Sequence, residues 1–158
     1  PFQRYLNGDY EALTYEEKMG ASIFFSKGQC ANCHTGPALN KMEFHALGLN
    51  EFNPSEVTFY NLDDPTKFGR YSFTKEEEDK YKFKTPQIYN LRELKFIGYR
   101  ASMNSVREII EYKNESISEN PEVPTEVLRL SPKGLTEAEI TQLTLFVENV
   151  LYDNNLNR

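Results

Sequence analysis

The chain has 158 residues, a length that suits one domain with a single sizeable hydrophobic core. Its formal charge of −6 at pH 7 and its isoelectric point near 5.1 exclude the basic surface on which nucleic-acid binding depends. No apolar run approaches the roughly 18 residues of a membrane-spanning helix, and a hydrophobic content of 39% with 13% aromatic residues is typical of a folded protein.

The N-terminal segment Pro1–Leu13 is polar and aromatic, with a turn signal at Gly8. We expect this segment to be an incoming linker that packs loosely. Thr14 and Glu17 then have the spacing of a capping box, in which the hydroxyl and the carboxylate each satisfy a free amide at a helix start. The apolar residues that follow predict a short amphipathic helix that ends at Gly28.

Two long stretches lack regular periodicity. From His45 to about Tyr81 the chain is interrupted by Gly, Asn, Pro and Asp residues, and a connection this long inside a compact domain is typical of a functional or wrapping loop. The stretch Glu115–Lys133 holds three prolines and predicts at most one turn, around Thr125–Leu130.

Two more helices begin with capping-box patterns. Ser105 and Glu108 precede a short helix that is expected to reach about Lys113. Thr136 and Glu139 open the last helix, which the Asp-Asn-Asn run near the C-terminus closes. The apolar face of this helix repeats with the helical period and comprises Ile140, Leu143, Phe146, Val147, Val150 and Leu151.

These elements predict a mostly helical fold with long loops, because no strand-like alternation of comparable quality occurs. The expected organisation is a linker over residues 1–13 followed by one domain over residues 14–158. Because the chain begins at Pro1 without a methionine or a signal peptide, we expect either a mature processed product or a fragment of a longer protein.

The only two cysteines lie three positions apart and are followed by one of the only two histidines, in the motif Cys30-Ala31-Asn32-Cys33-His34. Two thiols at this spacing on a tight turn can add across the two vinyl groups of a haem, and the adjacent imidazole can coordinate the iron. The motif therefore predicts one covalent haem c, held by Cys30 and Cys33 with His34 as the proximal iron ligand. We expect a cytochrome c-like helical domain whose long loops wrap this haem.

Two other kinds of site use similar residues. A thioredoxin-like C-x-x-C is expected at a strand-to-helix junction in a βαβ setting, and no such setting is visible. A zinc site needs four ligands, whereas only the motif residues and the distant His45 are present, and adjacent Cys33 and His34 have difficulty pointing at one tetrahedral metal. The haem interpretation is favoured, and because bacterial haem attachment takes place outside the cytoplasmic membrane, we expect a periplasmic or otherwise exported protein.

The residues after the motif are expected to lie beside the cofactor. The segment Thr35-Gly36-Pro37 allows the chain to turn away under the ring, which makes Pro37 a cofactor-contacting candidate. A backbone carbonyl in this segment could accept the other ring N–H of His34 and fix its tautomer. His45 is a candidate second iron ligand, and the alternative is a hydrogen bond to a loop or to a haem propionate.

Three blocks around the motif resemble one known family. They are A-L-T-x-x-E-K-x-G at Ala12 to Gly20, G-x-C-x-x-C-H-x-G-P at Gly28 to Pro37 and F-H-x-L-G at Phe44 to Gly48. They resemble the C-terminal haem domain of bacterial dihaem cytochrome c peroxidases and of the MauG family. Three later blocks fit the same domain, namely G-R-Y at Gly69 to Tyr71, Y-K-F-K-T-P-Q-I-Y-N-L at Tyr81 to Leu91 and the start of the last helix at Gly134.

The resemblance implies a dihaem protein with two domains. In that family peroxide reacts at the N-terminal haem, the C-terminal haem takes electrons from a carrier, and calcium often lies between the domains. Since this chain has one haem motif, it corresponds to the electron-entry half, and the second haem would come from a missing segment or a partner chain. The acidic composition suits a basic redox partner protein.

Two other functions stay open. One is a stand-alone monohaem electron carrier, or a cytochrome subunit of a larger exported complex, without catalysis of its own. The other is a haem-bearing interaction module in which the loop from Asn50 to Asp79 docks a partner. A second C-x-x-C-H about one domain length upstream would favour the enzyme.

The second axial ligand of the iron is where the sequence departs from the family pattern. In an ungapped alignment the family's usual histidine position is occupied by Tyr99, and its usual distal Met or Tyr falls on Lys113, with Tyr112 one place before. Met103 is a candidate thioether ligand. An equally favoured interpretation is that its apolar side chain covers the haem edge without binding the iron. Tyr112 as a phenolate, Lys113 as a deprotonated amine and an open sixth position are the remaining alternatives.

Further cationic and apolar side chains are assigned to the surroundings of the haem. Arg70, Arg100 and Lys84 are candidates to neutralise the propionates, the alternative for each being a solvated surface charge. Met42 follows the motif too closely to act as a ligand and is expected to pack.

Overall fold

The computed structural model describes residues 1–50 and 65–155. The α-helices in these ranges are α1 (Phe2–Leu6), α2 (Tyr15–Phe25), α3 (Tyr71–Thr74), α4 (Val106–Glu115) and α5 (Glu137–Leu145), and α5 continues into a π-helical turn at Phe146–Val150. Two short strands, β1 (Phe44–His45) and β2 (Phe83–Lys84), pair antiparallel. Turns of 3-10 helix lie at Tyr10–Ala12, Cys30–Asn32, Pro65–Phe68, Glu77–Asp79, Leu91–Glu93, Tyr99–Ala101 and Thr125–Val127. The expectation of a mostly helical protein is confirmed for this part of the chain.

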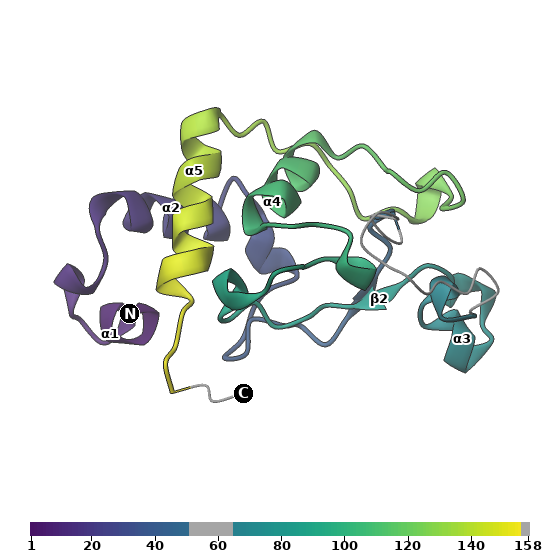
Figure 1. Cartoon of the computed structure of the whole chain (residues 1–158), viewed down its shortest axis with the longest axis horizontal. Coiled ribbons are helices and arrows are strands. Elements are labelled where there is room, and N and C mark those ends of the chain that lie inside the picture. Colours follow the sequence, from purple (N-terminus) through teal and green to yellow (C-terminus); the bar gives the residue numbers. More distant parts are fainter. Residues whose placement is uncertain (51–64, 156–158) are drawn as a thin grey trace.

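The core lies where α5 crosses α2, which passes behind it in the view of Figure 1. Gly20 is the point of closest approach, because a β-carbon there would lie 2.0 Å from the carbonyl oxygen of Gln142. The helices can approach this closely only where one of them has no side chain. The side chains of Phe24, Leu143 and Phe146 fill the space around the crossing and are almost completely buried.

The N-terminal segment is part of this core, so the expectation that it packs loosely is wrong. Phe2 on α1 is 7% exposed, and its ring meets that of Phe146 edge-to-face at 5.4 Å between centroids. It also stacks on Phe25 at 6.1 Å. The contact with Phe146 joins the two ends of the chain, and local sequence patterns carry no signal for it.

The capping boxes behave as the sequence predicts at two of three sites. At Thr14 and at Thr136 the hydroxyl accepts from the backbone N–H three residues on, and the glutamate accepts from the backbone N–H of the cap residue. At the start of α4 the Ser105 hydroxyl accepts from Glu108 N–H, but the Glu108 carboxylate accepts instead from the backbone N–H of Asn104 at 2.8 Å. The first turn of α4 is therefore capped one residue further out.

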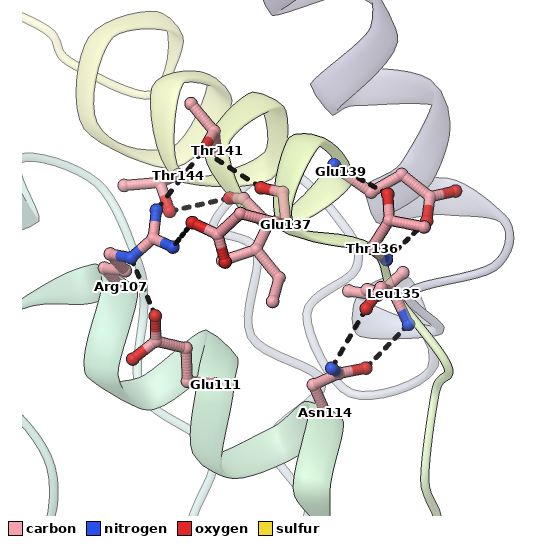
Figure 2. A network of polar contacts seen from close by, with 10 residues as sticks. Arg107, Glu111, Asn114, Leu135, Thr136, Glu137, Glu139, Thr141 and Thr144 are labelled. Carbon is pink, nitrogen blue, oxygen red and sulfur yellow. Dashed lines mark hydrogen bonds and ion pairs between the residues drawn. The ribbon is translucent and has the colours of Figure 1, made fainter.

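Helix α4 is tied to α5 by a set of polar contacts (Figure 2). Arg107 on α4 forms an ion pair with Glu137 and donates to the Thr141 hydroxyl at 3.2 Å. At the other end of α4, Asn114 accepts from Leu135 N–H at 2.7 Å and donates to the Leu135 carbonyl at 3.2 Å. These contacts fix α4 against the start of α5 and so fix which way its last turn faces.

The chain beyond the π-helical turn is held by a buried asparagine. Asn90, which is 3% exposed, accepts from the N–H of Asp153 at 2.7 Å and donates to its carbonyl at 3.0 Å. Its own N–H donates to the Leu151 carbonyl at 3.1 Å. The last helix thus stops close to the predicted Asp153, with its end anchored to the segment that follows β2.

The predicted irregular stretches are only partly described. The single turn expected around Thr125–Leu130 is confirmed at Thr125–Val127. The described part of the stretch from His45 to Tyr81 contains α3 and two short 3-10 turns, whereas residues 51–64 of the proposed docking loop lie outside the described residues. Across the ranges that are described, no helix has both the length and the apolar character needed to cross a bilayer.

Candidate functional site

The two cysteines lie on one short turn that follows α2. Helix α2 ends at Phe25, the N–H of Gly28 donates to the Ile23 carbonyl at 2.8 Å, and the chain then enters the 3-10 turn Cys30–Asn32. The backbone N–H groups of Cys33 and His34 both donate to the carbonyl of Cys30, at 3.2 and 2.8 Å. The turn therefore holds both thiols next to the imidazole, and the thiols are not joined to each other.

The Cys30 thiol is largely enclosed by the protein. It packs against the main core and donates a hydrogen bond to the Gly28 carbonyl, with 3.6 Å between sulfur and oxygen. Burial disfavours the thiolate and raises the pKa of Cys30 to about 11, although Lys133 and Lys113 act in the opposite direction. A thiol in such surroundings is a poor general nucleophile, so the turn does not resemble the activated site of a thiol-disulfide oxidoreductase.

A backbone carbonyl selects the tautomer of His34. Its Nδ1 lies 3.0 Å from the carbonyl oxygen of Leu39, which can only accept, so Nδ1 carries the proton. In this tautomer Nε2 carries the lone pair, which is the form that binds a metal, and the Pro86 backbone carbonyl also acts on the ring. Burial lowers the pKa of His34, which favours the neutral imidazole that metal coordination requires.

The tautomer-fixing carbonyl comes from a residue that the sequence analysis did not name. The expected carbonyl lay within Thr35-Gly36-Pro37, whereas the observed one belongs to Leu39, a 4%-exposed residue with a φ of +46°. Pro37 lies in the same loop, and its carbonyl accepts from the Tyr89 hydroxyl at 3.2 Å. The loop after the motif is thus fixed at both Pro37 and Leu39, and only the buried apolar character of Leu39 is a signal visible in the sequence.

Lys113, near the end of α4, lies within electrostatic range of the motif. Its ammonium is close enough to Cys30 and Cys33 for their charges to interact, and its positive charge also acts on His34. Burial lowers the pKa of Lys113 to about 8, and the neighbouring Lys133 acts in the same direction. Within residues 1–50 and 65–155 the ammonium makes no hydrogen bond or ion pair, unlike Lys133, whose Nζ donates to Gln29 at 3.0 Å.

Met103 and Tyr112 belong to a second, smaller apolar cluster. Together with Leu49 they are buried. The side chains that pack around them are partly buried and comprise Leu47, Ile97, Tyr99, Ile109 and Leu130. The Tyr112 hydroxyl donates to the Leu47 carbonyl, and burial raises its pKa to about 12. Both features keep the phenol protonated.

Tyr99 and two of the three cationic candidates for the propionates have other partners. The Tyr99 ring packs against Phe83 with 4.0 Å between centroids, and its hydroxyl donates to the Thr66 carbonyl at 3.1 Å. Arg70 forms an ion pair with Asp79 at 3.0 Å, and the Arg100 guanidinium donates to the Thr66 hydroxyl. Lys84 is exposed on β2.

His45 lies on β1 and is electrostatically coupled to the motif. Its side chain is 18% exposed, and its Nε2 lies 3.3 Å from a Glu43 carboxylate oxygen without the alignment of a hydrogen bond. Burial lowers the pKa of His45, against the opposing effect of Glu43, and the charge of Lys113 also acts on it. Met42 is 62% exposed, so the expectation that it packs is wrong.

The motif residues do not form a compact set of metal ligands by themselves. No group of three or more His, Cys, Asp or Glu side chains is arranged to hold a metal ion in the part of the chain that the structure describes. Cys30, Cys33 and His34 therefore do not converge on one point as zinc ligands would. Two thiols on one turn, one of them enclosed, beside an imidazole whose Nδ1 is held by a backbone carbonyl fit a group that bonds the sulfurs at its rim and the nitrogen at its centre.

Curated relatives of known function match nearly the whole chain, although no family model does. The cytochrome-c peroxidase IdrP1 of Denitromonas iodatirespirans is 31% identical over 171 residues, which cover 94% of this chain and 43% of that protein. The cytochrome c peroxidase Ccp of Escherichia coli is 39% identical over 92 residues, which cover 58% of this chain and 18% of that protein. The methylamine utilization protein MauG of Methylorubrum extorquens is 25% identical over 152 residues, which cover 95% of this chain and 38% of that protein. The chain thus spans less than half the length of these relatives.

Solved structures show the same fold. A MauG-like protein associated with microbial copper homeostasis superposes with a TM-score of 0.67 at 21% identity, over 89% of this chain and 48% of that one. The dihaem peroxidase BthA of Burkholderia thailandensis superposes with a TM-score of 0.67 at 17% identity, over 90% and 43%. The sequence and structure comparisons agree in matching this chain to less than half of a longer protein, which in the case of BthA is a dihaem peroxidase.

Proposed function

Because this chain is a homologue of the bacterial cytochrome c peroxidases and MauG, we propose that it is the electron-entry haem domain of a dihaem peroxidase-like oxidoreductase. The observation that carries this proposal is the geometry of the motif. Cys30 and Cys33 lie on one turn, and His34 next to them is oriented by the Leu39 carbonyl, which holds the ring proton on Nδ1 and leaves the lone pair on Nε2. We assign the two thiols to thioether bonds with one haem c and His34 Nε2 to the iron as its proximal ligand.

Haem c supplies a reversible one-electron change at the iron when it is bound. The chain's own contribution is to tether the ring, to orient the imidazole and to keep it neutral. The Leu39 carbonyl that accepts a hydrogen bond from Nδ1–H would also make Nε2 a stronger electron donor, which favours oxidised iron. The enclosed side chain of Cys30 would hold its thioether bond at the edge of the main core.

In the proposed whole protein this domain passes electrons to a second haem. Reduction of peroxide to two waters consumes two electrons and two protons, so a domain with one haem delivers its electrons in two steps. The second haem lies either in a preceding domain or in a partner chain, and calcium between the two domains stays a prediction from the family resemblance. The formal charge of −6 suits a basic electron donor, and we propose a periplasmic or otherwise exported location.

Rapid mixing of the haem-loaded protein with a reduced basic c-type cytochrome tests the proposal. We expect electron transfer to this haem at a rate that falls as salt is added, because salt screens attraction between opposite charges. Peroxide should reoxidise this haem quickly only when the second haem is present. Fast direct reoxidation without the second haem would overturn the electron-entry role, and absence of any second haem in the natural protein would favour a stand-alone carrier.

A further inference from the structure

The loop that orients His34 has an unusual backbone conformation. Leu39 has a φ of +46°, a region that residues with a β-carbon rarely adopt, and its carbonyl oxygen lies 3.0 Å from His34 Nδ1. The Leu39 N–H donates to the Gly36 carbonyl at 3.0 Å. A strained conformation of this kind persists only where surrounding contacts hold it, so the direction of the Leu39 carbonyl depends on what fixes the loop.

Tyr89 holds this loop from a distant part of the chain. Its hydroxyl donates to the Pro37 carbonyl at 3.2 Å, across 52 positions of sequence. Burial raises the pKa of Tyr89, against the opposing effect of the Gln3 side chain, so the hydroxyl stays protonated and can donate. The bonded carbonyl lies only two residues before Leu39.

The base of the Tyr89 side chain is itself well anchored. The Tyr89 N–H donates to the side-chain oxygen of Gln87 at 2.7 Å, and its ring packs against the main core. The next residue, the buried Asn90, exchanges hydrogen bonds with Leu151 and Asp153 just beyond the π-helical turn. The hydroxyl therefore extends from a fixed segment and can restrain the loop rather than follow it.

The other contacts of the loop act at different points. The Lys41 N–H donates to the Cys33 carbonyl at 3.1 Å, which closes the loop behind Leu39. The Leu39 side chain is buried in the main core. These contacts hold the far end of the loop and one side chain, whereas the Tyr89 hydroxyl binds the peptide group between Pro37 and Ala38 directly.

We propose that Tyr89 is a positioning residue for the proximal imidazole. Its hydrogen bond to Pro37 fixes the loop, and the loop in turn aims the Leu39 carbonyl at His34. The inference rests on the proposed haem attachment and names a residue that sets how strongly the proximal ligand donates. Without the hydroxyl, the carbonyl is aligned with Nδ1–H for less of the time, so the imidazole donates less electron density and oxidised iron is less favoured.

The variant Tyr89→Phe tests this role, because it removes the hydroxyl and keeps the ring that packs on the core. In the haem-loaded protein, potentiometric titration should give a higher reduction potential for the variant than for the wild type. NMR of the oxidised protein with isotope-labelled histidine should show the Nδ1–H of His34 exchanging with solvent several-fold faster. Tyr152→Phe removes a hydroxyl that donates to Glu93, and as the matched control it should change neither quantity.

Both changes are required, so a Tyr89→Phe variant in which either quantity keeps its wild-type value would overturn the inference. A loss of thermal stability alone, similar to that of Tyr152→Phe, would make Tyr89 a packing residue only. Covalent haem is measured on every sample as the pyridine haemochrome. Because only haem-loaded molecules give a paramagnetically shifted Nδ1–H signal, partial loading of a variant does not obscure the exchange rate. A wild type without covalent haem would instead refute the proposed function.

Discussion

At the scale of single residues, the site depends on where one proton of His34 lies. The Leu39 carbonyl holds that proton on Nδ1, and Nε2 is thereby left for coordination. Because the acceptor is a backbone atom inside a fixed loop, the orientation does not depend on the protonation of any side chain. This arrangement keeps the proposed proximal ligand in one tautomer over the pH range in which a carboxylate partner would titrate.

The two cysteines should each contribute one thioether bond. Cys30→Ala and Cys33→Ala should each retain haem through the remaining sulfur, with one vinyl group left conjugated to the ring. Conjugation shifts absorption to longer wavelength, so the pyridine haemochrome maximum of each variant should lie to the red of the wild type. Met42→Leu, at an exposed position just beyond the motif, is the control and should show no shift. An unshifted maximum in either cysteine variant would contradict two-point attachment.

The residues that were predictable at this scale are those whose chemical role depends only on their neighbours in sequence. The motif at Cys30, Cys33 and His34 is contiguous, so its chemistry can be inferred from spacing alone. The Leu39 carbonyl could not be predicted, because any residue has a carbonyl and only the fold of the loop aims this one. The position of Lys113 depends on how α4 packs against a turn that lies far away in sequence, and the sequence therefore left it among several ligand candidates.

At the scale of elements, the crossing of α2 and α5 positions the motif, because the turn that carries Cys30 and Cys33 follows α2 directly. Lys27, just past the end of α2, forms an ion pair with Glu139 on α5 at 2.7 Å. Near the start of α2, Glu16 accepts from the Gln142 side-chain amide at 2.7 Å. Both contacts are exposed and contribute modestly, whereas the close approach at Gly20 fixes the helices through packing.

Substitution of Gly20 by alanine should separate these helices. The added carbon would lie 2.0 Å from the Gln142 carbonyl oxygen and 2.8 Å from the β-carbon of Phe146, both in a packed interior. Overpacking of this kind destabilises a protein by about 1–3 kcal/mol, which should outweigh the better helix propensity of alanine. Thermal unfolding measures the difference, with Ser22→Ala on the exposed face of α2 as control. Equal stability of Gly20→Ala and wild type would refute the close contact.

The cap of α5 should make stability depend on pH. Hydrogen bonds from Lys27 and from the Thr136 backbone lower the pKa of Glu139 below its usual 4.5. The folded state therefore favours the ionised form of Glu139 more than the unfolded state does. The resulting contribution of Glu139 to the free energy of unfolding is complete above pH 4.5 and is lost as the pH falls through the lowered pKa. The stability gap between wild type and Glu139→Gln should therefore narrow in acid. Glu126→Gln, at an exposed site, is the control, and a gap that widens in acid would refute the account.

Element boundaries were predictable where they depend on neighbours in sequence. The complete capping boxes at Thr14 and Thr136 start their helices where the pattern predicts, because all the groups involved lie within one turn. The burial of Phe2 against Phe146 was missed because it joins the two ends of the chain. The π-helical turn after Leu145 was missed as well, since the apolar repeat continues through it without a break.

At the scale of the whole molecule, the chain spans 43% of the length of the cytochrome-c peroxidase IdrP1. Proteins of this family that carry two haems need two attachment motifs, and this chain has one. We predict that the natural gene, or that of a stable partner, encodes a second C-x-x-C-H about one domain away from Cys30. Sequencing of the locus and a haem count per complex check this. One haem per complex would contradict the two-haem assignment.

The central claim, a haem held by two thioether bonds on the turn from Cys30 to Cys33, is tested most directly by intact-mass measurement of the denatured protein. The account predicts a mass larger than that of the polypeptide by one haem, no thiol that reacts with an alkylating agent, and, after digestion, the added mass on the peptide that contains His34. A colourless protein with the mass of the bare polypeptide and two alkylated cysteines, after production with haem-attachment machinery, would contradict it.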